Sequence, residues 1–314
     1  MTDARISENR VKLHRKSKVV RLSGSDRIFH ILNYLILMLV GLTVLYPLVY
    51  SVSSSLSSTQ AILEHRVILL PVELTLDSYK AVLNYSLLRS GFMNSILYTF
   101  LNTFVAVTLL LLAAYPLSRK DLPGRKYFLI FFVITMFFNG GMIPNYLLMK
   151  NLHLTGTRSA LVIGFAFSCY NMIIVRSYFQ SNISSSLLDA AHIDGCNDLD
   201  FFRIIVLPIS KPIIATMVLF NAVGNWNGYF NAMLYLNKPE MYPMQIILRD
   251  ILFVASMPPE IMNKMDQSRV QSLQNLFEQL RYAVLVVGAL PMMILYPFVQ
   301  KYFIKGVMIG SLKE

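Results

Sequence analysis

Residues 189–195 read DAAHIDG, and residues 205–208 read IVLP, with another proline at Pro212. This polar, small-residue stretch lies between two long hydrophobic segments. Irregular polar backbone is not tolerated against lipid, because its N–H and C=O groups would lack hydrogen-bond partners. The stretch therefore belongs at a face of the membrane, where it can dock another molecule.

Local signals predict a compact structure for this stretch. Residues 187–193 favour a short helix, with Ser184, Ser185 or Ser186 as its N-cap. Ala190 and Ala191 would give the helix a smooth surface that another protein could approach closely. Gly195 follows, where a positive φ commonly ends a helix. A second short run over 199–206 leads into prolines that restrict the backbone, so we expect a rigid helix-turn-helix joined to two membrane helices.

The composition indicates a polytopic membrane protein. The 314 residues are 55% hydrophobic and only 14% charged, whereas soluble domains carry about 25% charged residues. The net charge of +11 is not arranged as a basic groove with interleaved aromatics, which argues against nucleic acid as a partner. The two cysteines, Cys169 and Cys196, lie in a predicted span and in the polar loop, so no disulfide framework is expected.

Six segments are apolar over about the 20 residues that a membrane-spanning helix needs. We therefore expect an all-α membrane protein with six transmembrane helices. We expect residues 1–27 to form a basic N-terminus, without the apolar core of a signal peptide, and residues 28–314 to form one six-helix membrane domain with a polar loop at 180–211. The six expected spans are 28–52, 93–117, 127–149, 157–178, 212–236 and 282–303.

The distribution of lysine and arginine predicts the orientation. The first 27 residues hold eight basic residues, and the nine-residue loop 118–126 holds four. With the N-terminus inside, the polar loop and the C-terminal tail also lie inside, and these regions together hold 18 of the 28 basic residues. Both termini are therefore expected in the cytoplasm. The basic N-terminus is read as this topology signal, and a lipid or partner site is the alternative.

The polar loop resembles the EAA motif in permease subunits of binding-protein-dependent ABC importers. Asp189 stands where that family usually has Glu, one methylene shorter with the same charge. The other matching positions are Ala190, Ala191, Asp194, Gly195, Phe202, Ile205, Leu207, Pro208 and Pro212. In the family, the helix that matches 187–195 is the coupling helix, which lies in a cleft of an ATPase. The resemblance thus assigns ATPase coupling to Asp189, Ala190, Ala191, His192, Asp194, Gly195, Leu207 and Pro208.

Other segments are similar to the carbohydrate-importer branch of this family. They include Asn94-Ser95, Gly140-Gly141 and Trp226-Asn227. Within this branch, residues 242–245, which read YPMQ, are similar to the subgroup of lipoprotein-associated oligosaccharide permeases. The resemblance covers residues 28–314 and implies a type I ABC importer permease (MetI-like, MalG-like) fold in a bacterial cell membrane. It also implies a second permease subunit, two copies of an ABC ATPase, an extracellular solute-binding protein, and a sugar, oligosaccharide or uronate-type glycan as cargo.

The chain has no GxxxxGK[ST] phosphate-binding loop. We therefore expect a non-catalytic subunit without a cofactor or metal of its own, in which ATP and Mg²⁺ are bound by the partner ATPase. The acidic residues and His192 of the polar loop could instead form a metal or acid–base site. Their spacing does not place three or four ligands on one face, so docking is the preferred interpretation.

The fifth expected span carries polar groups that are costly in lipid unless they are satisfied. Trp and Tyr can stack on sugar rings and Asn can pair with hydroxyls, which would make this span a wall of the substrate pathway. Hydrogen bonding between helices at the subunit interface is the alternative. Asn221, Asn225 and Tyr229 are spaced to share one helical face. The candidate pathway residues are Asn221, Asn225, Trp226, Asn227 and Tyr229.

Two further segments leave alternatives open. Gly140, Gly141 and Pro144 predict either a flexible break in the third span or, preferably, a packing notch with a kink. The outer segment 237–279 can contact the binding protein or lie on the membrane surface.

Competing functions fit the sequence less well. A secondary transporter driven by an ion gradient usually needs an ionisable residue inside the membrane, and no expected span has an acidic residue in its interior. An intramembrane hydrolase would need a facing nucleophile and base, and no span offers a Ser-His pair. A passive scaffold would leave the stiff polar loop unexplained.

Overall fold

The computed structural model describes residues 24–138, 140–255, 277–278, 280–297 and 300. The chain divides into two compact units, 1–49 and 50–314. In the first unit, the described residues form the greater part of one helix, α1 (Gly24–Ser55), whose side chains there are almost all exposed. This helix contains the expected span 28–52. An all-apolar, exposed surface is what a lipid-facing helix requires.

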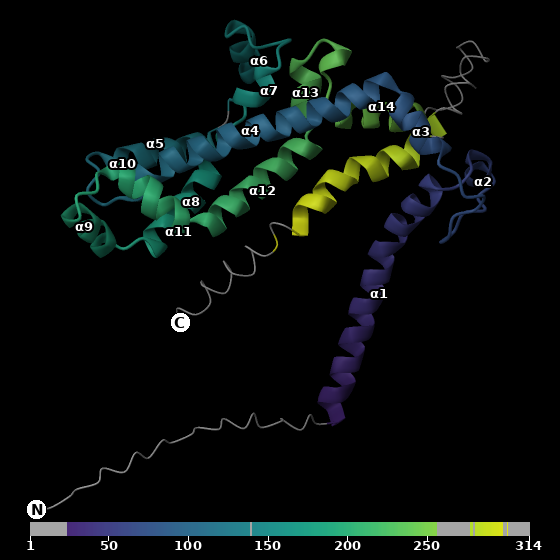
Figure 1. Ribbon diagram of the computed structural model, residues 1–314, viewed down its shortest axis with the longest axis horizontal. Coiled ribbons are helices and arrows are strands. Elements are labelled where there is room, and N and C mark those ends of the chain that lie inside the picture. Colours follow the sequence, from purple (N-terminus) through teal and green to yellow (C-terminus); the bar gives the residue numbers. More distant parts are fainter. Residues whose placement is uncertain (1–23, 139, 256–276, 279, 298–299, 301–314) are drawn as a thin grey trace, which may run out of the picture. The chain divides into compact units, whose positions relative to one another are not determined.

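In its described part, the second unit consists of helices joined by turns and irregular loops (Figure 1). Its last described helix is long and apolar and spans Leu280–Pro297. The remaining elements are α2 (Thr59–Leu63), α3 (Asp77–Asn84), α4 (Ser86–Ser118), α5 (Arg125–Phe137), α6 (Met142–Asn151), α7 (Ser159–Ile163), α8 (Cys169–Asn182), α9 (Ser185–Ile193), α10 (Asp198–Asp200), the π-helix η1 (Phe201–Val206), α11 (Leu207–Ile209), α12 (Lys211–Asn227), α13 (Phe230–Tyr235), the 3₁₀ helix η2 (Pro239–Met241) and α14 (Met244–Ala255).

Helix α4 is the central element of this unit. Its 33 residues pack along α12 and α8, and also against α14, α3 and α7. Figure 1 shows α8 to α11 gathered near one end of α4, with α3 and α14 near the other. A hydrophobic core packs these helices together at the first end. Its essentially fully buried residues include Leu110, Ala114, Val175, Phe179 and Val206. A second core, which includes Leu88, Met244 and Leu280, joins the other end.

Polar side chains of α4 hold the segment that follows α13. Asn94 donates to the carbonyls of Glu240 (2.7 Å) and Tyr242 (3.2 Å), and Ser95 Oγ accepts from Met244 N (2.8 Å). These bonds satisfy backbone groups that would otherwise be costly to bury. The Asn94-Ser95 pair therefore fixes the start of α14 on α4.

The described residues contain three helices long and apolar enough to cross a membrane, or five if each bent helix pair is one span. The expectation of six continuous spans is therefore not confirmed. The expected third span is interrupted between α5 and α6, and Gly141, with φ 86°, has a backbone conformation that favours glycine. The third span is thus broken at the glycines, and the packing notch with a kink, the preferred interpretation of the sequence, is not what the structure has. The last expected span, 282–303, lies partly outside the described residues.

The expected fourth and fifth spans are also broken. In the fourth, α7 and α8 are separate helices, and α8 begins with its own cap, in which Ser168 Oγ accepts from Asn171 N (3.3 Å). In the fifth, α12 ends at Asn227 because Gly228 is extended, with φ −76° and ψ 118°. Hydropathy detects apolar length but not such interruptions, because neighbouring helices can satisfy the freed backbone groups.

Candidate functional site

The polar loop forms the predicted short helix, α9. Of the three candidate serines, Ser184 is the N-cap: its Oγ accepts from Leu187 N at 3.3 Å. Gly195 follows the helix with φ 82°, and its N–H donates to the carbonyl of His192 (3.1 Å). The predicted end at Ile193 is confirmed, and a serine cap is confirmed, but the helix begins at Ser185, two residues before the predicted start.

The two faces of α9 have different environments. Leu187, Leu188 and Ala191 pack against the core formed by α4, α8 and α12, and Ala191 is only 4% exposed. Asp189 and Ala190 are exposed, and Ile193 is 86% exposed. Ala191 thus does not share the exposed face with Ala190, because its small side chain allows α9 to lie against its own core. Ile193 instead places an apolar side chain on the outer face.

The return from α9 to the membrane contains a π-helix. Asn197 caps α10 by accepting from Asp200 N (2.9 Å), and Phe201, Phe202 and Val206 of η1 are buried in the same core as Ala191. Pro208 has no N–H to donate and its ring collides with the carbonyl four residues back in a regular helix. The widened η1 turn lies directly before it. The chain then bends by 77° between the segments Asp198–Ile209 and Lys211–Asn227.

The remaining predicted loop residues have distinct positions. Leu207 is half-buried and packs against the same core, whereas Pro208, His192 and Asp194 are exposed. The rigid connection expected between α9 and α12 is therefore built mainly from buried residues of η1. Of these, the sequence motif includes Phe202 but not Phe201 or Val206.

A group of ion pairs connects the end of α4 to the polar loop. Arg119 directly follows α4 and binds Asp121 (2.9 Å from Nε to Oδ1) and Asp198, the first residue of α10. Nε2 of His192 lies 3.5 Å from the same carboxylate of Asp198. The hydrogen bond with Asp121 contributes most to raising the pKa of Arg119, and Arg119 in turn lowers the pKa of Asp121. Arg119 therefore stays charged. A cavity of about 560 Å³ lies between these ion pairs and α9 and is lined by residues of both.

The acidic residues of this loop do not converge on one point. Asp198 faces Arg119, and Asp200 accepts from Asn197 Nδ2 (2.7 Å). In the part of the chain that the structure describes, no three His, Cys, Asp or Glu side chains form a group suited to a metal ion.

The polar residues of α12 are distributed between the inside and the outside of the subunit. Asn225 Nδ2 donates to Asn102 Oδ1 on α4 (2.7 Å), and Asn221 Nδ2 donates to its own helix at the carbonyl of Met217 (2.8 Å). Asn227 and Tyr229 are exposed next to the helix break. Since α12 ends at Asn227, Tyr229 does not continue the helical face of Asn221 and Asn225, which corrects the expected alignment.

Trp226 lies inside the subunit. It is 2% exposed, its Nε1 donates to the carbonyl of Gly288 (2.8 Å), and its ring contacts Phe92 edge-on. Trp226 thus joins α12 to the helix Leu280–Pro297 in this conformation. Its ring is not available to stack on a sugar here.

Residues 81–309 match the family model described as the binding-protein-dependent transport system inner membrane component. The chain belongs to this family. It is 38% identical, over 92% of its length and 99% of the relative, to the polygalacturonan/rhamnogalacturonan transport system permease protein YtcP of Bacillus subtilis. It is 28% identical to the multiple sugar-binding transport system permease protein MsmG of Streptococcus mutans, over 93% and 100% of the two chains.

A solved structure shows that the fold of this permease is also similar to that of a known ABC transporter. It is a bacterial ABC transporter involved in the import of the acidic polysaccharide alginate, with 37% identity and a TM-score of 0.82 over 90% of this chain and 98% of that one. The all-helical ABC importer permease fold is thereby confirmed. The expected function is also confirmed: the chain is a non-catalytic, multi-pass inner-membrane permease subunit of an ABC importer. The alternative of an ion-coupled transporter is therefore rejected.

The sequence alone does not indicate a role for three residues in and around the polar loop. Ile193 is only one residue of the short helix, Arg119 contributes only to the topology signal, and Asp198 is one of several acids in the loop. The charge signal was present in the sequence, but the 79-residue separation of Arg119 from Asp198 hides their contact.

Proposed function

We propose that this permease imports an oligosaccharide that an extracellular solute-binding protein delivers, and that α9 is the coupling helix that docks into one of two ABC ATPase copies. A second permease subunit would complete the translocation pathway. The observation that carries the proposal is the two-sided burial of α9. Its inner face is built into the core of the subunit, whereas its outer face exposes Ile193, Asp189 and Ala190. A helix held in this way can transmit displacement in both directions.

We also propose six crossings of a bacterial cell membrane with both termini in the cytoplasm. In this topology, 1–27 is a cytoplasmic N-terminus and 28–314 is the permease domain, with the coupling loop at 180–211. The lysine and arginine distribution supports this orientation. The broken segments α5–α6 and α7–α8 would each form one crossing. The second permease subunit would cover the irregular backbone at these breaks, most of which is exposed in the single subunit. The coupling residues would be Asp189, Ala190, His192, Ile193 and Asp194. Ala191 and Leu207 would support them from the core, and Gly195 and Pro208 would set the course of the backbone.

The substrate pathway is proposed at the break between α12 and α13. Asn227 and Tyr229 expose an amide and an aromatic ring there, which suits hydroxyl groups and sugar faces. Asn225 and Asn221 lie on α12, about one and two helical turns before this break. We assign Trp226 a packing role. Breaks of this kind are typical of transporter binding sites.

The proposed cargo is a uronate-containing oligosaccharide. Two similar proteins support this choice: one belongs to a polygalacturonan/rhamnogalacturonan transport system, and the other is an ABC transporter involved in the import of the acidic polysaccharide alginate. The test is uptake into proteoliposomes that contain the complete complex, with oligogalacturonates and matched neutral oligosaccharides as cargo. We expect binding-protein-dependent uptake of the acidic series, and selective uptake of the neutral series would reject the cargo assignment.

The ion pairs of Arg119 provide a prediction for the coupling route. Asp198→Asn should lower the substrate transported per ATP hydrolysed several-fold, because it disconnects α4 from the coupling loop. Asp121→Asn is the matched control: it removes another carboxylate from the same arginine but leaves the connection between elements intact. Exposed ion pairs contribute at most about 1 kcal/mol, so both variants should fold. Equal coupling ratios in the two variants, measured in proteoliposomes, would contradict this route.

A further inference from the structure

Two arginines meet at the end of α4. Arg125 Nε (3.0 Å) and Arg176 Nε (2.9 Å) both donate to the carbonyl of Leu117, in the last turn of that helix. They come from α5 and α8, and both side chains are half-buried. The C-terminus of a helix attracts cations through its free carbonyls, which explains why one arginine binds there. One carbonyl does not neutralise two guanidinium groups.

Among the described residues, this pair has no carboxylate counter-ion. In the described ranges, neither Arg125, Arg176 nor the adjacent Lys126 forms a salt bridge with a carboxylate. Arg119, only six positions before Arg125, has two carboxylate partners. Like charges that are partly withdrawn from water repel each other unless an anion lies near them. The pair therefore favours binding of an anion from outside the chain.

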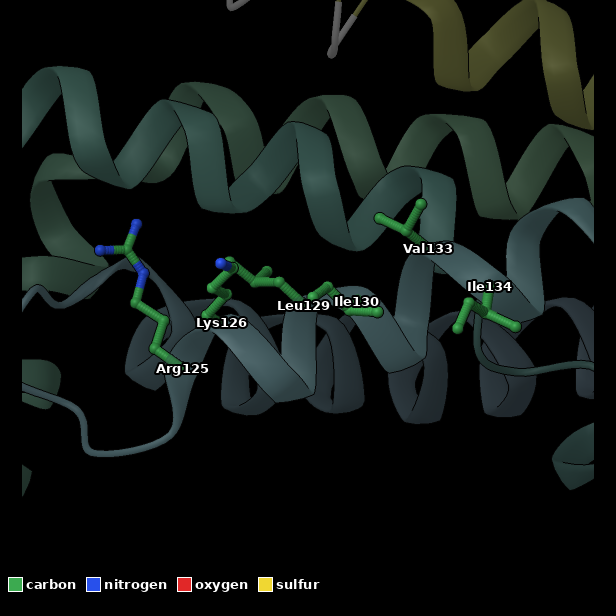
Figure 2. A pocket seen from close by; sticks show the side chains of 6 residues that line it. All are labelled: Arg125, Lys126, Leu129, Ile130, Val133 and Ile134. Carbon is green, nitrogen blue, oxygen red and sulfur yellow. The ribbon is translucent and has the colours of Figure 1, made fainter.

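An apolar groove leads away from these cations along α5. Figure 2 shows Arg125 and Lys126 at one end of the groove, followed along the helix by Leu129, Ile130, Val133 and Ile134. The cavity has a volume of about 460 Å³. Cationic nitrogens at one end and branched aliphatic side chains beyond them match the two parts of a phospholipid, a charged headgroup and an acyl chain.

We propose that Arg125, Lys126 and Arg176 bind the phosphate of an anionic phospholipid whose acyl chain lies in the α5 groove. Basic clusters at the ends of membrane helices commonly attract anionic lipids. Arginine provides planar N–H pairs that suit phosphate oxygens, and the exposed Lys126 adds a mobile charge. The lipid would neutralise the paired arginines and fix the junction of α4, α5 and α8, which lies beside the Arg119 ion pairs. This site is independent of the proposed cargo and of the docking role of α9.

The test uses the purified complex and phosphatidylglycerol as the probe, with bound lipid counted by native mass spectrometry against a phosphatidylcholine background. Arg125→Gln with Lys126→Gln should weaken phosphatidylglycerol binding by about tenfold or more, given the contribution of each basic residue to anionic-lipid binding. Lys120→Gln with Lys211→Gln removes the same net charge away from the groove and should leave binding unchanged. Equal loss in both double variants, or none in either, overturns the site.

Two further measurements distinguish a lipid from free phosphate and separate a loss of binding from a failure to fold. Inorganic phosphate at millimolar concentration should not displace the lipid, because it lacks the acyl chain; displacement would overturn the lipid assignment. If the double variant of Arg125 and Lys126 fails to assemble, the single variant Lys126→Gln tests the site, because Lys126 is exposed and its substitution should not affect folding. A several-fold loss of phosphatidylglycerol binding supports the site, and unchanged binding overturns it.

Discussion

Ile193→Asp should release the ATPase from the importer and reduce transport by about tenfold or more, the scale of a central interface residue. Ile193 is 86% exposed on a helix whose opposite face is buried in the core. Covering this side chain with a partner removes apolar surface from water, and a carboxylate at the same position would have to be desolvated instead. Because the side chain makes little contact within the subunit, folding of the permease should be unaffected.

The measurement is co-purification of the ATPase with the tagged permease pair, followed by uptake in proteoliposomes. Ile193→Val is the control, since it keeps an apolar group and should retain most of the ATPase. A stable complex with normal uptake in the aspartate variant would show that α9 docks elsewhere or not at all.

Asn102→Leu should destabilise the permease by about 2 kcal/mol, because three hydrogen bonds of about 0.6 kcal/mol each are lost in a membrane protein. Asn102 is 1% exposed and joins three elements: its Nδ2 donates to the carbonyls of Leu161 (2.9 Å) and Val162 (3.0 Å), and its Oδ1 accepts from Asn225. Leucine would leave two carbonyls near α7 and one amide of α12 without this partner. Buried groups left unsatisfied in this way are destabilising.

Thermal unfolding in detergent measures this effect. Asn227→Leu, on the exposed side of the α12 break, is the matched control and should change stability by less than about 0.5 kcal/mol. If the two variants unfold at the same temperature, Asn102 does not hold the junction.

The membrane class and the short helix at the polar loop could be predicted because they depend on local sequence. Apolar length predicts spans, and the serines and Gly195 predict the ends of α9. The DAAHIDG motif further indicated the family. The burial of Ala191 could not be predicted, because Ala190 and Ala191 are chemically identical and only the packing of α9 on η1 and α8 distinguishes them.

The breaks in the spans were harder to predict for a physical reason. Gly228 and Gly141 were visible in the sequence, but a glycine in a membrane helix can be a packing notch or an interruption, depending on its neighbours. Trp226 illustrates the same limit: an indole suits a sugar face, yet here its N–H is satisfied by Gly288 on another helix. Tertiary contacts decide between two roles that the side chain alone permits.

The central claim, that α9 docks the ATPase, is tested most directly by photocrosslinking from position 193. A benzophenone amino acid at Ile193 in the assembled importer should form an adduct with the ATPase, and the same group at Leu74, which is 74% exposed in the loop before α3, should not. An adduct with the solute-binding protein from position 193, or none with the ATPase, would contradict the account.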